Sequence, residues 1–158
     1  MHENRELLPP TATHVGFVGS KKPMTPAQTS RVYTLLVGFG AVEVHMGGRV
    51  GADEQMHELA DRARLWRMVH PASTSPTAPA CTGDVVFPAK PDSDRYHDIV
   101  DAAGVLIAAP ESAGERGCRT WVTIAHALGA GCPVVIVYPS GRAVRFGRPA
   151  GSIDRRVR

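Results

Sequence analysis

The chain has 158 residues, of which 43% are apolar and 21% are charged, and its formal net charge is +3. This length supports one buried core and is too short for two ordinary domains, and no apolar run approaches the roughly 20 residues of a membrane span. Residues 1–10 lack the apolar core of a signal peptide, and the three cysteines form no C-x-x-C pair. We therefore expect a soluble, cytoplasmic protein that does not contact a membrane.

The charge is distributed unevenly along the chain. From Pro139 to the C-terminus six arginines stand against one aspartate, a local charge of +5, so the rest of the chain carries −2 (+3 minus +5). We predict an N-terminal extension over 1–13, one domain over 14–141 and a basic, flexible tail over 142–158, because glycine and proline interrupt any helix there. A solvated tail is one interpretation. Nonspecific contact with nucleic acid, or packing on a partner subunit, is the other.

The first predicted strand covers 14–18, and a helix is predicted over 26–37. Thr25 is its N-cap, a proline follows at the first helical position, and Gln28 completes a capping box. Gly38 and Gly40 end the helix.

The next predicted strand covers 41–46, followed by a helix over 53–65 and a strand over 67–70. Residues 71–83 are rich in proline, serine, threonine and alanine and form a loop. Because this loop is long for a compact domain, we expect it near a ligand or an interface. A short strand is predicted over 84–87.

The last part of the domain continues the alternation. A helix over 93–103 begins with a capping serine, and 105–109 is a strand. The glycine-containing loop 110–117 leads to a helix over 120–128, and a strand follows over 133–138. Repeated β-α units of this length predict parallel strands, right-handed crossovers and helices on both faces of the sheet. The expected fold is a Rossmann-like three-layer α/β/α domain with a mainly parallel, doubly wound sheet.

Two glycine-bearing turns, 19–22 and 47–53, each follow a predicted strand and precede a helix. Such turns direct backbone amides and the positive end of a helix dipole at one point, where a phosphate binds. The loop 110–121 lies at the same edge of a doubly wound sheet. The residues predicted to bind a ligand or phosphate are Gly19, Ser20, Lys21, Gly47, Gly48, Arg49, Gly51, Asp53, Arg95, Pro110, Gly117, Thr120 and Trp121.

Several of these residues have an alternative interpretation. Lys21 and its neighbour Lys22 neutralise a phosphate or belong to a solvated face. Asp53 contacts a ribose hydroxyl or favours the dipole of the helix that it begins. Trp121 stacks on a base or belongs to the core. The seven histidines form no H-x-x-x-H pattern and no cluster with cysteine, so no metal site is predicted.

Five motifs in this order resemble the SLOG superfamily, which includes the Lonely-guy hydrolases, the DprA recombination mediators and the molybdenum-cofactor carrier proteins. They are the G-S of 19–20, the G-G-x-x-G-x-D of 47–53, the D-R…I-V-D-A of 94–102, the A-A-P of 108–110 and the T-W of 120–121. The resemblance spans about 15–141. It implies a Rossmann-like fold, a nucleotide or phosphorylated cofactor as ligand, and a homodimer or higher homo-oligomer.

The chain departs from the hydrolase motif P-G-G-x-G-T-x-x-E of that superfamily. Gly117 and Thr120 match it, but Arg119 replaces a glycine, and Thr123 stands where the glutamate acts. A threonine hydroxyl does not serve as an acid-base carboxylate near neutral pH. The resemblance therefore favours binding over hydrolysis.

Three hypotheses follow. The first is binding of a nucleotide, nucleotide derivative or phosphorylated cofactor by a carrier, sensor or sequestering protein. The second is a nucleotide or nucleoside N-glycosidase in which Glu111 or Glu115 replaces the missing glutamate, although solvated side chains on a polar loop explain both residues as well. The third is a DprA-like accessory protein that contacts nucleic acid through the basic tail.

Overall fold

The computed structural model describes residues 12–78, 81–113 and 118–147. Its strands are β1 (His14–Gly19), β2 (Glu43–Met46), β3 (Trp66–Val69), β4 (Val85–Val86), β5 (Val105–Ala109), β6 (Val134–Val137) and β7 (Ala143–Phe146). Its helices are α2 (Pro26–Phe39), α3 (Ala52–Arg62), α4 (Asp92–Ala102) and α5 (Arg119–Gly129).

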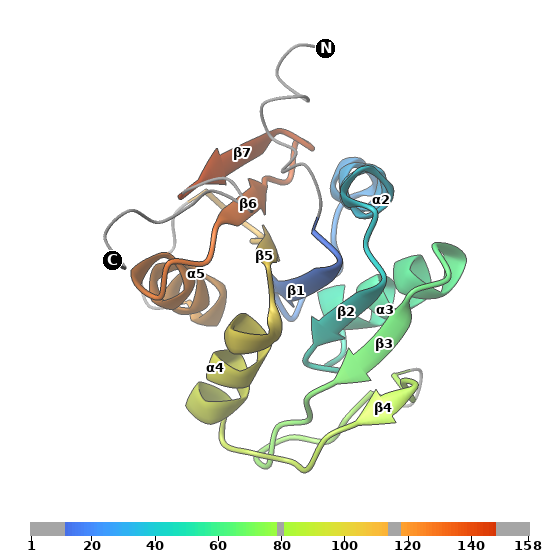
Figure 1. Cartoon of the computed structure of the whole chain (residues 1–158), viewed down its shortest axis with the longest axis vertical. Coiled ribbons are helices and arrows are strands. Elements are labelled where there is room, and N and C mark those ends of the chain that lie inside the picture. Colours follow the sequence, from blue (N-terminus) through green and yellow to red (C-terminus); the bar gives the residue numbers. More distant parts are fainter. Residues whose placement is uncertain (1–11, 79–80, 114–117, 148–158) are drawn as a thin grey trace.

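The strands form one sheet in the order β4-β3-β2-β1-β5-β6-β7 (Figure 1). Neighbouring strands from β4 to β6 are parallel, and β7 pairs antiparallel with β6. The chain builds outward from β1 to β4 and then returns to place β5 on the other side of β1. This reversal of direction defines a doubly wound sheet with its switch point between β1 and β5. The predicted Rossmann-like α/β/α fold is confirmed.

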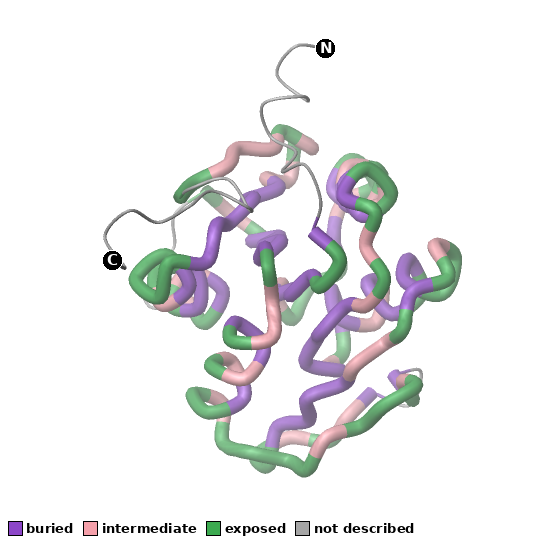
Figure 2. Tube along the Cα trace, in the orientation of Figure 1, coloured by how far each residue is buried: buried purple, intermediate pink, exposed green. Residues whose placement is uncertain are grey.

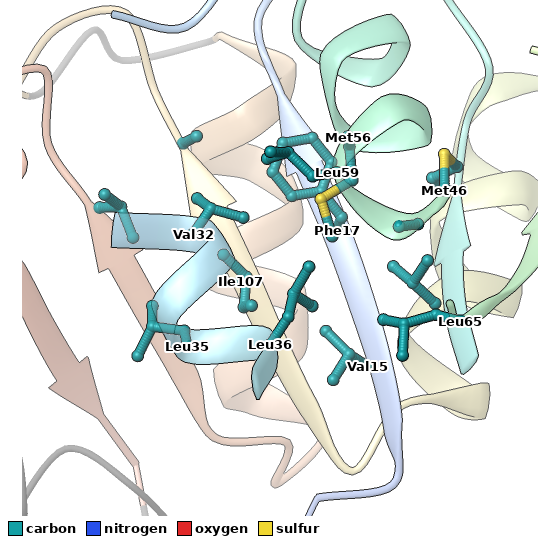
Figure 3. Packing of buried hydrophobic residues seen from close by; sticks show 14 of the residues in the cluster. Val15, Phe17, Val32, Leu35, Leu36, Met46, Met56, Leu59, Leu65 and Ile107 are labelled. Atoms are coloured by element: carbon teal, nitrogen blue, oxygen red, sulfur yellow. The ribbon is translucent and has the colours of Figure 1, made fainter. Parts of the chain in front are cut away.

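Helices α2 and α3 cover one face of this sheet, and α4 and α5 cover the other (Figure 1). Alternate strand residues point to opposite faces, so Phe17 and Ile107 join the core under α2 and α3, whereas Leu106 joins the core under α4 and α5. Figure 3 shows the first of these cores. Strands β1 and β5 are buried along most of their length (Figure 2), which explains their continuous apolar runs.

The N-terminus of α2 has the predicted capping box. The Thr25 hydroxyl accepts a hydrogen bond from the Gln28 amide at 3.1 Å, and the Gln28 side-chain oxygen accepts one from the Thr25 amide at 2.9 Å. The Gln28 side-chain nitrogen also donates to the carbonyls of Pro110 and Val137, each at 2.9 Å. Gln28 therefore ties the start of α2 to the ends of β5 and β6. At the other end, Gly40 has φ 67° and terminates the helix as predicted, whereas Gly38 lies inside the helix and does not end it.

Two features differ from the sequence predictions. Helix α4 begins at Asp92 with Pro91 as N-cap, so Ser93 lies inside the helix and does not cap it. Strand β7 lies within the range 142–158 that was predicted to be a flexible tail, and its four residues pair with β6. The remaining tail residues, 148–158, and residues 1–11 of the predicted extension lie outside the described residues. Across the described ranges, no helix is long and apolar enough to cross a membrane.

Candidate functional site

A cavity of about 380 Å³ opens at the carboxyl ends of the central strands, beside the switch point between β1 and β5. The loops after β1, β2 and β5 form its wall together with residues near the starts of α4 and α5. The residues that line the cavity are Phe17, Val18, Gly19, Ser20, Lys21, Lys22, Gly47, Arg49, Asp53, Arg95, Tyr96, Ile99, Glu111, Cys118, Arg119 and Thr120.

The two glycine turns predicted from the sequence pack directly against each other. A side chain at Gly51, where φ is +104°, would overlap the Lys21 carbonyl. The Ala52 amide donates to the Ser20 carbonyl at 3.3 Å, and a Cβ at Gly19 would lie 2.5 Å from the Cβ of Ala52. Glycine at these positions therefore allows the first two loops to approach, and the approach builds one wall of the cavity.

Gly48 has a comparable structural role behind the cavity. Its φ is +78°, and a side chain there would meet Val69 at 2.8 Å. Its carbonyl accepts a hydrogen bond from the Ala78 amide at 2.8 Å, which joins Ala78 to the second turn. Neither Gly48 nor Gly51 is among the residues that line the cavity, whereas Gly47 is.

Gly47 provides the space for Arg95. The Arg95 side chain from α4 is only 2% exposed, and a Cβ at position 47 would overlap its guanidinium group and lie 2.9 Å from the Asp53 carboxylate. The Arg95 guanidinium also lies over the Tyr96 ring, 4.4 Å from its centroid. The Nε of Arg95 has no hydrogen-bond partner among the described residues. The cavity wall thus contains a buried arginine with one unsatisfied hydrogen-bond donor.

Three arginines from three parts of the fold converge on the Asp92 carboxylate. Its Oδ1 accepts hydrogen bonds from Arg49 at 2.5 Å and from Arg95 at 3.3 Å. Its Oδ2 lies 2.8 Å from an Nη atom of Arg119. Burial tends to raise the pKa of Asp92, but the three arginines outweigh that effect and hold the pKa below its ordinary value.

Asp53 lines the cavity and is 8% exposed. It accepts a hydrogen bond from the Arg49 amide at 3.0 Å. Burial raises the pKa of Asp53 to about 6, although this hydrogen bond and the nearby charges of Arg95 and Arg49 oppose the change. A buried carboxyl with a raised pKa inside a cavity is typical of a functional position.

The loop after β5 contributes a third part of the wall. Glu111 lines the cavity, and its carboxylate lies 3.8 Å from the Lys22 ammonium. Pro110 does not line it, and its carbonyl accepts the hydrogen bond from Gln28. Glu115 and Gly117 lie outside the described residues.

The remaining predicted residues lie near the start of α5 and have different environments. Thr120 is buried and lines the cavity. Trp121 instead packs against the core under α4 and α5, which corresponds to the structural alternative. Thr123 is a buried residue of α5, and its hydroxyl donates to the Arg119 carbonyl of the same helix at 2.9 Å. It is not a cavity residue.

The cavity carries a cationic surplus. Five basic side chains line it, against Asp53 and Glu111, and with the adjoining Asp92 the formal balance is +2 (five minus three); the basic residues are Lys21, Lys22, Arg49, Arg95 and Arg119. The sequence patterns did not identify Asp92, Tyr96 or Cys118 as site residues. The i, i+3 spacing of Asp92 and Arg95 on one helix is the sequence signal for the first of them.

A second group of polar side chains, formed by Glu43, His45 and His70, lies on the α4 side of the sheet. His45 contacts the His70 ring nitrogen at 2.8 Å and the Glu43 carboxylate at 2.5 Å, and His70 stacks on Phe87 with ring centroids 4.4 Å apart. Burial, followed by the nearby charge of His45, lowers the pKa of His70 to about 4. In the part of the chain that the structure describes, no group of three or more histidine, cysteine, aspartate or glutamate residues is arranged to hold a metal ion.

No protein-family model and no curated protein matches this sequence. Solved structures do match it. The molybdenum cofactor binding protein from the phototrophic bacterium Rippkaea orientalis is 23% identical, with a TM-score of 0.61, over 79% of this chain and 76% of that chain. The molybdenum cofactor carrier protein from Chlamydomonas reinhardtii is 22% identical, with a TM-score of 0.58, over 78% of this chain and 75% of that chain. This chain shares their fold.

Proposed function

We propose that this chain binds a small ligand that carries a phosphate group, in the cavity beside the switch point of the sheet. The buried Arg95 is the observation that carries this proposal. It lines the cavity at 2% exposure, and its Nε has no hydrogen-bond partner among the described residues. Burying a charged group with an unsatisfied donor is costly, and an incoming oxyanion would satisfy that donor.

The other properties of the cavity favour a nucleotide, a nucleotide derivative or a phosphorylated cofactor. Its volume of about 380 Å³ is that of a small-molecule site. The formal surplus of positive charge favours an anion, while Phe17, Tyr96 and Ile99 supply an apolar wall for a ring system. The molybdenum cofactor is a candidate because two proteins of the same fold bind or carry it. Such a ligand fits a carrier, sensor or sequestering protein.

The residue at position 123 favours a binding function over hydrolysis. Thr123 donates its hydroxyl hydrogen to the helix that contains it, and so supplies no carboxylate to the cavity. One observation supports the N-glycosidase alternative, because Glu111 lines the cavity. Incubation with nucleoside monophosphates distinguishes the two functions. Release of free base that is lost in Glu111→Gln would replace binding with hydrolysis as the function.

A thermal-shift and calorimetric titration with nucleoside monophosphates and the molybdenum cofactor tests the binding itself. We expect at least one of these ligands to bind, and Arg95→Gln to weaken it by about 10- to 100-fold, since hydrogen bonds to charged groups contribute about 1.5–3 kcal/mol. Native mass spectrometry of the freshly purified protein then identifies any ligand that remains bound.

Arg67→Gln is a matched control for Arg95→Gln. Arg67 is also an arginine with carboxylate partners, Asp61 and Asp84, but it does not line the cavity. Its substitution should change ligand affinity less than about twofold. Equal affinity in wild type and Arg95→Gln, or no binding of any ligand in the panel, would contradict the proposal. The nucleic-acid hypothesis depends on a tail whose residues 148–158 lie outside the described part of the chain.

A further inference from the structure

Asp92 adjoins the cavity and pairs with three arginines that line it, as an anionic ligand would. Both of its carboxylate oxygens are in use, one by Arg49 and Arg95 and the other by Arg119. The three arginines come from the loop after β2, from α4 and from α5, and all three line the cavity. A carboxylate of the chain itself therefore holds the groups that would recognise a phosphate.

One carboxylate does not satisfy this cluster. Three guanidinium groups carry +3; Asp92 contributes −1, and the Asp53 carboxylate, whose charge interacts with Arg49 and Arg95, contributes another −1 at pH 8, so the cluster keeps +1. The Nε atoms of Arg49 and Arg95 are buried and have no hydrogen-bond partner among the described residues. A phosphate monoester has three terminal oxygens and close to two negative charges, so it offers more than a carboxylate on both counts.

We propose that Asp92 is an internal competitor that reserves the arginines Arg49, Arg95 and Arg119 for a ligand with a terminal, dianionic phosphate. This inference rests on the proposed function of the cavity. The competition lowers the affinity for every anion. As a result, weakly bound monoanions do not occupy the site, whereas a phosphomonoester still does. Asp92 therefore limits occupancy of the site to anions that bind the arginines strongly enough to displace it.

The direction of the effect separates this role from a purely structural one. If Asp92 only positioned the arginines, its removal would loosen them and weaken anion binding. If Asp92 competes, neutralising it frees three cations and strengthens binding. Asp92→Asn keeps the shape of the side chain and removes the charge, so it compares the two roles directly.

The test is a calorimetric titration with inorganic phosphate at about pH 8 and constant ionic strength. We expect Asp92→Asn to bind phosphate about tenfold more tightly than wild type, which corresponds to about 1.4 kcal/mol. Asp94→Asn is the matched control, because Asp94 is exposed in the same first turn of α4 and forms none of the ion pairs with these arginines. It should change the affinity less than about twofold, since exposed charges are screened.

Asp92→Ser, which removes the charge and suits the first turn of a helix, replaces the asparagine variant if that variant does not fold. Unchanged or weaker phosphate binding in the folded variant, with wild type still binding phosphate through Arg95, would overturn the role of Asp92 alone. Absence of phosphate binding in wild type and in both Asp92 variants would overturn this inference together with the proposed function.

Discussion

Replacing Asp53 with asparagine should make this protein more stable at neutral pH. The carboxyl is buried, and its pKa is raised from the ordinary 3.8 to about 6, so the folded protein holds a proton that the unfolded chain has released. Between these two pH values the wild type therefore loses stability as the pH rises, by about 3 kcal/mol. Asparagine avoids this loss, because it is uncharged and its side-chain oxygen still accepts a hydrogen bond from the Arg49 amide.

We expect Asp53→Asn to exceed the wild type by about 2 kcal/mol at pH 8, or about 5 °C in Tm, and to match it below about pH 4. Urea unfolding of both proteins at several pH values, with linear extrapolation, gives the difference. Other titrating groups are common to both proteins and cancel in that difference. A variant that is less stable at pH 8, or a difference that stays constant with pH, would refute the reasoning.

Two further substitutions test the packing of the glycine turns and the buried histidine pair. Gly51→Ala should lower the free energy of unfolding by about 3 kcal/mol, because its φ of +104° and the adjacent Lys21 carbonyl both oppose a side chain. Gly129→Ala is the control, since no described atom beyond its chain neighbours and its own helix backbone lies within 4 Å of the added carbon, and it should be neutral or stabilising by up to about 1 kcal/mol in the same urea assay. His70→Gln should reduce the loss of unfolding free energy that the wild type shows as the pH falls below 6.5. Because the pKa of His70 falls from 6.5 to about 4 on folding, its contribution is complete above pH 6.5 and is lost as the pH falls toward 4. We expect that loss to be about 2 kcal/mol after solvent screening, and an unchanged profile in His70→Gln would exclude this assignment.

Most of the fold was predictable because its signals are local. All ten strands and helices predicted between 14 and 138 are present, with ends that differ by no more than three residues. The uninterrupted apolar run of β5 and the capping box at Thr25 depend only on nearby residues. Strand β7 was missed because its four residues are half-buried or exposed, and they form a strand through pairing with β6.

The site was predictable in position and less so in detail. The glycine turns were placed at the correct edge of the sheet because strand-turn-helix order determines that edge. Which glycine faces the cavity depends on its three-dimensional neighbours, so Gly47 beside Arg95 and Gly51 beside Lys21 look alike in sequence. Asp92 was missed because its three arginine partners come from separate segments, and their convergence is visible only in the folded chain.

Strand β7 also covers an edge of β6 that would otherwise be open to pairing with another molecule. All four residues of β6 are buried, and all are β-branched. If the chain ended at residue 141, β6 would become an open edge whose unpaired backbone groups and apolar side chains could recruit a strand of another molecule. The ladder with β7 occupies that edge, and Arg145 in its centre adds a charge that discourages further pairing. Removal of residues 142–158 should therefore reduce the solubility of the protein, even though every residue that lines the cavity is retained.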